Sequence, residues 1–335
     1  MFSTSYPRPK MTNLNLPSQV SLVFFLSVVG VTSLLGNGLD ILSWFILAPV
    51  RTPQNSYILS LAIADFLVGV FLVPSMIGEI ASNKWPFGRT YCQFYIMIAL
   101  LLCTVSVLHL VAISRDRYHV VFDTLTYRAR RRFPLFLRRI LLIWILAGYL
   151  IVPPMRDWNA IGDRTEIGSG LCIANTTRDL GVTVAFGNLF LPLSIIAGTY
   201  FAIHKELRRR GDGIGRSCYR SRGTLHIIFD NGSGSRSTSV GSGATRDLII
   251  SQDYKATKML GIIVAAFALS WTPFALGYAI IGFIPEDRRK SMIAQPIMVA
   301  IGYSNSAMNP IIYGLFNTNF REGFKKILFF WRSRK

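Results

Sequence analysis

Seven long stretches of hydrophobic residues alternate with shorter polar segments along this chain. They cover approximately residues 20–48, 56–80, 91–115, 140–155, 180–204, 256–284 and 292–316. Most exceed the length of about 18 residues that marks a helix able to span a bilayer. The fourth stretch is the weakest, because Pro153 and Pro154 should end its helix early. The pattern predicts an all-α membrane protein with a bundle of seven transmembrane helices.

A soluble protein with seven buried helices is the alternative explanation of this pattern. Each such helix would need a polar face toward water, and these stretches show almost none. Composition also favours a membrane protein, since 51% of the 335 residues are hydrophobic and 16% are charged, against about 25% charged residues in soluble domains. The first stretch is too long for a signal-peptide core, so we expect it to be retained as the first span.

The net charge of +19 suggests nucleic-acid binding, but the distribution of the charge indicates membrane orientation instead. With the N-terminus outside, the predicted inner segments hold 26 of the 36 Lys and Arg residues, and the outer segments hold 10. Basic residues gather on the cytoplasmic side of multi-pass membrane proteins. Clusters such as 130–132 and 208–210 should therefore face anionic lipid or a cytoplasmic partner, and we expect no nucleic acid.

These signals divide the chain into four parts. Residues 1–19 form an extracellular N-terminus, and 20–316 form the seven-span bundle. Residues 211–250 are rich in Gly, Ser and Arg and should be a flexible cytoplasmic third loop, although its apolar run 224–229 has no explanation. Residues 317–335 contain a predicted short amphipathic helix and tail on the inner membrane surface, with Phe320, Phe324, Ile327, Leu328 and Trp331 on one face.

The four cysteines are separated by this topology. Cys103 falls within the membrane and Cys218 in the cytoplasm. Only Cys92 and Cys172 lie on the oxidising side, so they should form a disulfide. The sequence also places the glycosylation acceptor Asn175 on the outer side.

The third stretch connects the two sides of the membrane. Cys92 and Arg117 are 25 positions apart, which corresponds to about 37 Å of helix, and a hydrocarbon core is about 30 Å thick. One helix therefore places a cysteine outside and the charged triplet Asp116-Arg117-Tyr118 inside. A helix exposed at both ends can carry a signal between two compartments.

Short motifs occur in order along the seven stretches. They are Gly36-Asn37, Leu61 to Asp65, Cys92, Asp116-Arg117-Tyr118, Trp144, Pro192, Tyr200, Phe267, Trp271 to Phe274, and Asn309-Pro310 with Tyr313. In this order and at these depths they resemble the rhodopsin-like (class A) G-protein-coupled receptors, from about residue 30 to residue 330. Segments 60–69, 85–88, 106–110 and 302–313 are most similar to the biogenic-amine branch.

The resemblance implies a plasma-membrane receptor, with its N-terminus outside, that passes an extracellular small-molecule signal to heterotrimeric G proteins. The signal would open the inner ends of the third and sixth spans. Arg117 would be held at rest by Asp116 and by Asp253 at the base of the sixth span, and Pro273 and Pro310 would allow helix bending. The implied coupling and switch residues are Asp116, Arg117, Tyr118, Tyr200, Asp253, Asn309, Pro310 and Tyr313.

Two acidic residues lie inside the predicted membrane region. Asp65 corresponds to a sodium site of the family, with Ser106, Asn305, Ser306 and Asn309 as its expected neighbours. A water-filled polar cluster without an ion is the alternative. Asp40, one turn inward from Asn37, is unexpected, and we predict that it joins the polar cluster near Tyr313.

The ligand-binding region departs from the amine receptors at Ala99. That branch has an aspartate there, which pairs with the ligand's ammonium group, and alanine cannot do this. The predicted lining is mostly apolar and aromatic: Ala99, Cys103, Val184, Asn188, Trp271, Phe274, Tyr278, Val299 and Tyr303. Glu79 is the nearest alternative anion, but we expect it to face solvent, so simple amines should bind poorly.

Other classes of protein fit less well. An opsin needs a lysine where this chain has Tyr303, and a transporter would need an inverted repeat or more intramembrane charge. An enzyme is not predicted, because the histidines (His109, His119, His204 and His226) are scattered and form no reacting constellation. A non-signalling or constitutively active receptor-like protein, acting as a scaffold or partner of another receptor, stays open as the alternative.

Overall fold

The computed structural model describes residues 15–123, 127, 132–152, 172, 185–228, 240–281 and 294–329. For 211–228 and 240–257, and at 278, 281, 294 and 295, only the backbone is described. Within these ranges the chain consists of helices joined by short turns, which confirms the all-α prediction.

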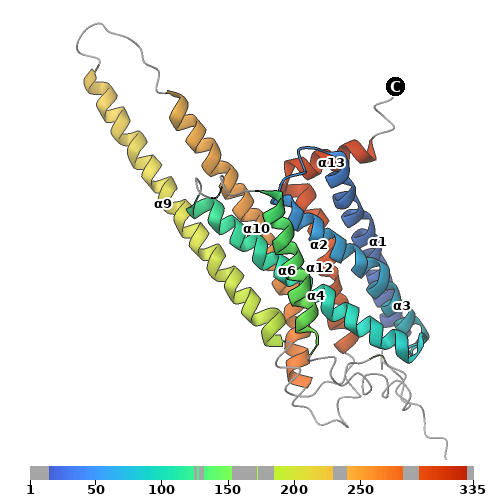
Figure 1. Cartoon of the computed structure of the whole chain (residues 1–335). Helices are drawn as coiled ribbons and strands as arrows, with labels where there is room; N and C mark the ends of the chain where they lie inside the picture. The colour runs from blue at the N-terminus through green and yellow to red at the C-terminus, as the bar shows by residue number, and fades with distance from the viewer. Residues whose placement is uncertain are drawn as a thin grey trace, which may run out of the picture.

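Each of the seven hydrophobic stretches contains helix, and the helices form one bundle (Figure 1). The first span is α1 (Leu16–Ile46), and the second consists of α2 (Asn55–Leu67), the π-helical turn η1 (Val68–Leu72) and α3 (Val73–Ser82). The third and fourth spans are α4 (Gly88–Phe122) and α6 (Phe133–Leu150). The fifth is η4 (Phe186–Phe190) with α9 (Leu191–Ile228), the sixth is α10 (Val240–Ile281) and the seventh is α12 (Ala294–Phe316).

The surface of the bundle suits lipid. Six of the described helical segments are long and apolar enough to cross a membrane, and α12 is less hydrophobic because it carries Ser304, Asn305, Ser306 and Asn309. Large apolar side chains point outward on several helices, such as Phe24, Leu142 and Phe201. An apolar surface of this kind is unfavourable in water but matches the hydrocarbon of a bilayer.

The start of the fourth helix differs from the predicted stretch. The fourth helix begins at Phe133 rather than near 140, because Pro134 suits a first helical turn and Arg138 and Arg139 continue the helix. The Arg139 guanidinium lies 5.6 Å from the centre of the Phe136 ring. This helix ends at Leu150, before Pro153, as expected.

Much of 211–250, predicted as a flexible loop, is helical. Helix α9 continues to Ile228 and α10 starts at Val240, and both project beyond the rest of the bundle (Figure 1). A helix that is already formed adds residues without paying again for nucleation, so polar segments can extend a stable span. Residues 229–239 lie outside the described part of the chain.

The second span contains a π-helical turn that the hydrophobic pattern did not indicate. Turn η1 ends immediately before α3, and Pro74 is in the first turn of α3. Proline has no backbone N–H, so a wider turn before it avoids a missing i→i−4 bond. The outer part of the span is thereby turned relative to a regular helix.

The last helix, α13 (Thr318–Leu328), crosses the end of the bundle toward which α9 and α10 project (Figure 1). The Asn317 side chain caps it by accepting from Asn319 N–H at 3.1 Å. Phe320 is buried while Arg321, Lys325 and Lys326 are exposed, which agrees with an amphipathic helix. Trp331 lies outside the described residues.

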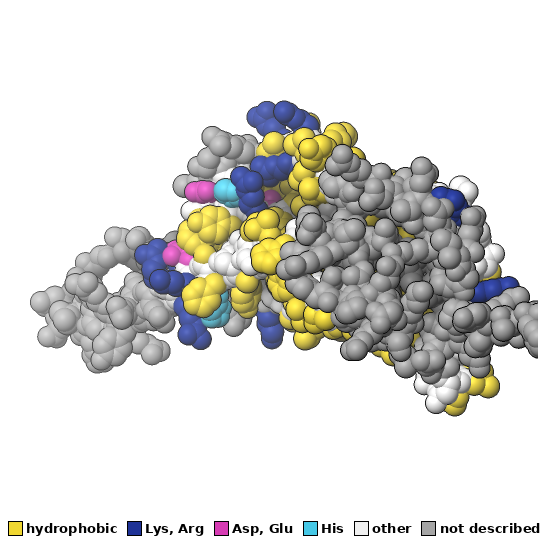
Figure 2. Space-filling model, turned by 90° about the horizontal axis from the view of Figure 1, so that it is seen from below, with side chains coloured by type: hydrophobic (Ala, Val, Ile, Leu, Met, Phe, Trp, Pro, Cys, Tyr) yellow, Lys and Arg dark blue, Asp and Glu magenta, His cyan; other side chains and the backbone are white. Residues whose placement is uncertain are grey.

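Basic side chains are unevenly distributed around the molecule. In the end-on view of Figure 2, Lys and Arg gather mainly in the half from which α9 and α10 project. Lys205, Arg208 and Arg209 are exposed on α9 in this region. This distribution is the one expected if the projecting end of the bundle is cytoplasmic.

Candidate functional site

The centre of the bundle is organised around the buried carboxylate of Asp65. Its side chain is completely buried, and its Oδ1 accepts a hydrogen bond from Ser306 Oγ at 2.7 Å. Its Oδ2 accepts from Asn309 Nδ2, also at 2.7 Å, and Ser106 of α4 lies beside the carboxylate. Asn305 is buried next to Ser306 on α12. The predicted polar residues of the second, third and seventh spans are therefore together.

The first span joins the same polar network. Asn37 Nδ2 donates to the Ser306 carbonyl and to the Ser33 carbonyl, each at 2.9 Å, and Ser33 Oγ donates to the Asp65 carbonyl at 2.8 Å. A Cβ added at Gly36 would lie only 2.5 Å from Pro310 Cγ. The backbone of α1 at Gly36 therefore packs directly against the Pro310 ring of α12.

The residues around Asp65 fit a small hard cation by chemistry. One carboxylate is surrounded by hydroxyl and amide oxygens, which are ligands that such cations accept. Within the described part of the chain, no group of three or more His, Cys, Asp or Glu side chains forms a metal site. A cation here would therefore depend on Asp65 for charge, with Ser106, Asn305, Ser306 and Asn309 supplying neutral oxygens.

Asp40 is a second buried acid, one turn inward on α1. Its side chain is 1% exposed, and neither carboxylate oxygen has a hydrogen-bond partner among the described residues. The same holds for Asn37 Oδ1, Ser43 Oγ and Tyr313 Oη. Asp40 and Tyr313 lie close enough to interact electrostatically, in keeping with the predicted cluster.

The inner end of α4 holds the Asp116-Arg117-Tyr118 triplet. Asp116 is buried and accepts a hydrogen bond from Tyr127 Oη, which lies between α4 and α6. Burial, together with the neighbouring carboxylate, raises the pKa of Tyr127 above its ordinary value, so its hydroxyl stays a donor. Arg117 is half-buried and directly follows Asp116 in the chain. The predicted partner Asp253 lies outside the described side chains.

Helix α4 is connected to α9 at this end. The Tyr118 ring stacks on Phe122 at 4.2 Å and packs against a small cluster of Val121, Ile203 and Leu207. Arg210 Nη2 donates to the Val121 carbonyl at 2.6 Å.

Tyr200 extends these inner contacts to α10. A Cβ added at Gly261 would lie 2.8 Å from the Tyr200 ring, so this ring packs directly on the α10 backbone. Helix α9 therefore contacts α4 beside Tyr118 and α10 beside Tyr200.

The predicted ligand-binding residues lie in the outer half of the bundle. Trp271 and Phe274 of α10 meet edge to face with ring centres 5.7 Å apart. A Cβ at Gly302 would lie 2.9 Å from the Trp271 ring, so this ring packs directly on α12. Cys103 has a free thiol, and Ala99, Trp271 and Val299 are partly accessible while packing against the outer core.

Asn188 is fixed by α4, since its Oδ1 accepts from Thr104 Oγ1 at 3.1 Å. Val184 lies outside the described residues, and so does the side chain of Tyr278. The structure therefore leaves two of the nine predicted lining positions without a description of their surroundings.

One residue near this region was missed by the sequence analysis. The hydroxyl of Tyr95 is 2.8 Å from that of Tyr303, and both side chains are buried. The pair joins α4 to α12 one turn outward from Ala99. The signal for Tyr95 was its spacing of four residues from Ala99, which places both on one helix face.

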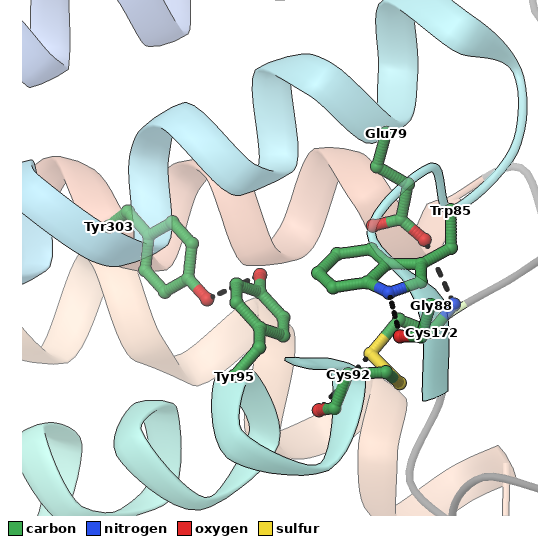
Figure 3. The surroundings of a disulfide bond; sticks show 7 residues. All are labelled: Glu79, Trp85, Gly88, Cys92, Tyr95, Cys172 and Tyr303. Atoms are coloured by element: carbon green, nitrogen blue, oxygen red, sulfur yellow. Dashed lines mark hydrogen bonds between the residues drawn. A yellow bond between two sulfur atoms is a disulfide. The ribbon is translucent and has the colours of Figure 1, made fainter. Parts of the chain in front are cut away.

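The outer end of the bundle is tied by the predicted disulfide. Cys92 and Cys172 are bonded, with their Cα atoms 5.5 Å apart, which confirms the pairing. Cys172 N–H donates to Glu79 Oε1 at 3.1 Å (Figure 3). The expectation that Glu79 faces solvent was wrong: its side chain is only 8% exposed. The disulfide brings the segment at Cys172 over the end of α3, a contact between residues 93 positions apart that the local pattern could not reveal.

Comparison with known proteins agrees with this architecture. Residues 36–313 match the family described as 7 transmembrane receptor (rhodopsin family). The chain is 28% identical to the probable G-protein coupled receptor No18 of Amphibalanus amphitrite, covering 92% of the chain and 90% of that protein. It is 27% identical to the 5-hydroxytryptamine receptor 1B of Homo sapiens, covering 95% and 88%. A tyramine receptor of Caenorhabditis elegans is 26% identical, covering 91% and 83%.

Proposed function

Because the chain belongs to the rhodopsin family of seven-transmembrane receptors, related to amine receptors, we propose that it senses an extracellular small molecule and activates heterotrimeric G proteins. It acts at the plasma membrane with its N-terminus outside. The observation that carries this proposal is the buried hydrogen-bond network in which Ser306 and Asn309 of the seventh span donate to Asp65 of the second.

The ligand signal enters through the contact between α10 and α12. A ligand beside Phe274 displaces Trp271, whose ring packs directly on Gly302 of α12. Both helices contain an interior proline, Pro273 and Pro310, at which they can bend. Movement of α12 then alters the hydrogen bonds that Ser306 and Asn309 make to Asp65.

The output is an opening of the inner ends of α4 and α10. At rest, Asp116 accepts a hydrogen bond from Tyr127, and Tyr118 packs on Phe122 and on α9. Arg117, the residue between Asp116 and Tyr118 in the chain, is half-buried. The activated state releases Arg117 toward the G protein, and Asp253 is its proposed partner before release. A ligand that binds the open state more tightly shifts this two-state equilibrium.

A sodium ion at Asp65 would favour the resting state. When bound, it would neutralise the buried carboxylate and hold α2, α4 and α12 together through Ser106, Asn305, Ser306 and Asn309. This role rests on the all-oxygen surroundings of Asp65.

Replacing Arg117 with alanine tests the proposed output. We expect Arg117→Ala to reduce receptor-dependent nucleotide exchange to background, both basal and with a ligand library, while surface expression is unchanged. The reason is that the guanidinium would be the group exposed to the G protein. Arg115→Ala is the matched control, because Arg115 is an exposed arginine of the same helix; it should keep most of the exchange activity. Purified G proteins and membranes from expressing cells provide the measurement.

Unchanged exchange in Arg117→Ala would contradict the mechanism. A wild-type receptor that shows no exchange with any G protein or ligand would favour the second candidate, a scaffold or partner of another receptor. The observation behind that candidate is Ala99, which removes the amine-binding acid of the related branch.

A further inference from the structure

The carboxylate of Glu79 is buried at the outer end of α3 without a basic partner among the residues that the structure describes. Its Oε1 accepts from Cys172 N–H at 3.1 Å, and no other described residue hydrogen-bonds or ion-pairs with this side chain. A carboxylate that is 8% exposed and has one backbone donor carries a large uncompensated desolvation cost. A cation bound beside it would offset that cost.

The Trp85 ring lies beside this carboxylate, with Tyr95 and Tyr303 beyond it (Figure 3). The Trp85 and Tyr95 rings lie 5.1 Å apart, and Trp85 donates its indole N–H to the Gly88 carbonyl at 2.8 Å. That hydrogen bond fixes the indole through its edge. Tyr95 and Tyr303 are both near enough to Glu79 to interact with its charge. Ring faces attract ammonium and guanidinium groups, so rings beside a carboxylate form an environment suited to a cation.

Glu79 also lies in the same half of the bundle as Ala99, where the amine receptors have an aspartate. Within the described spans, Asp65 and Asp40 lie at mid-membrane and further inward, and Asp116 at the inner end, so Glu79 is the one acid of the outer half. The Tyr95–Tyr303 pair connects its surroundings to Ala99, one turn inward.

We propose that Glu79, with Trp85 and Tyr95, binds the cationic group of the receptor's ligand, an ammonium or a guanidinium. This anchor takes the place of an acid at position 99 and lies nearer the outer surface. The ligand class is therefore a small organic cation, in contrast to the poor amine binding expected from Ala99 alone. The inference rests on the proposed function and identifies the chemistry recognised at that site.

Direct binding to the full-length receptor in lipid nanodiscs tests this anchor. The probes are 5-hydroxytryptamine and tyramine at up to millimolar concentration, each paired with its neutral alcohol analogue, 5-hydroxytryptophol and tyrosol. We expect the amines to raise the melting temperature in a dose-dependent manner and the alcohols to have little effect. In Glu79→Gln, amine affinity should fall about tenfold or more, because a charge-assisted contact is lost.

Glu79→Gln keeps an oxygen that can accept from Cys172 N–H, so a purely structural role predicts unchanged amine binding in this variant. Glu322→Gln removes an exposed acid of α13 and serves as the charge control; it should bind like wild type. If Glu79→Gln is too unstable to assay, the amine and alcohol pairs on the wild-type receptor decide. Equal binding of amine and alcohol, equal affinity in Glu79→Gln, or no response to any amine overturns the inference.

This binding assay is independent of G-protein activation. Amine binding through Glu79 without nucleotide exchange would overturn the proposed function while supporting the cation anchor. Nucleotide exchange driven only by neutral ligands would support the proposed function and overturn the cation anchor.

Discussion

At the scale of single residues, this receptor is distinguished by where its acids are. Ala99 removes one acid from the third span, while Glu79 and Asp40 are buried acids in the second and first spans. Glu79 has one backbone donor, whereas neither oxygen of Asp40 has a hydrogen-bond partner among the described residues. Buried polar groups without partners are costly, so Asp40 should lower the stability of the resting state.

Replacing Asp40 with valine should stabilise the receptor. The change removes an unpartnered buried carboxyl and leaves an apolar group of similar size, so we expect the free energy of unfolding to rise by about 1–3 kcal/mol. Asp40→Asn is the control, because it keeps a polar group there and should gain less. Thermal unfolding of ligand-free receptor in nanodiscs measures both. A lower melting temperature for Asp40→Val would mean that the carboxyl is satisfied by a bound molecule.

At the scale of helices, close contacts between a backbone and a rigid ring determine how the spans meet. Gly36 of α1 faces the ring of Pro310, which cannot rotate away as a flexible side chain could. The neighbouring hydrogen bonds from Asn37 to α12 depend on the same short separation between the helices. This contact therefore supports the network around Asp65 as well as the packing of α1.

Gly36→Ala should destabilise the bundle. The added methyl group would lie 2.5 Å from Pro310 Cγ, so α1 must shift, and we expect a loss of about 1–3 kcal/mol in the free energy of unfolding. Gly198→Ala is the matched control, since nothing lies within 4 Å of its added Cβ; its better helix propensity should leave stability unchanged or slightly higher. Melting temperatures of the two variants test this, and equal values would contradict the packing argument.

At the scale of the whole molecule, the exposed basic side chains and the disulfide support the same orientation of the chain in the membrane. The disulfide between Cys92 and Cys172 belongs on an oxidising side. Helix α13 and the projecting part of α9 lie toward the opposite end of the bundle (Figure 1), and α9 carries exposed bases. Both observations support the proposed orientation with the N-terminus outside, which the distribution of Lys and Arg also predicts.

Two glycosylation sequons test this orientation. Asn175 follows Cys172 on the proposed outer side, and Asn231 falls in the proposed cytoplasmic connection between α9 and α10; both lie outside the described residues. We expect Asn175→Gln to abolish the gel-mobility shift caused by enzymatic deglycosylation, because only the outer acceptor meets the glycosylation machinery. Asn231→Gln should leave the shift unchanged. A shift that is lost only in Asn231→Gln would reverse the topology.

The sequence was sufficient for most of the fold and for part of the site. Hydrophobic length located the seven spans, and the predicted topology indicated the pairing of Cys92 with Cys172. The resemblance to the receptor family implied that Ser106, Ser306 and Asn309 gather around Asp65. The predicted start of α6 near residue 140 was wrong, because the charged residues Arg138 and Arg139 belong to the helix and not to the loop before it. The helical extensions of α9 and α10 beyond the bilayer were missed as well.

What the sequence alone determined was the number and order of the spans and membership of the receptor family, because these follow from hydrophobic length and short motifs. The tertiary structure decided the surroundings of single polar groups. It buried Glu79 beneath Cys172, joined Tyr95 to Tyr303 and left Asp40 without a hydrogen-bond partner among the described residues. These outcomes depend on contacts between helices distant in the chain, and no local pattern of hydrophobic and polar residues encodes them.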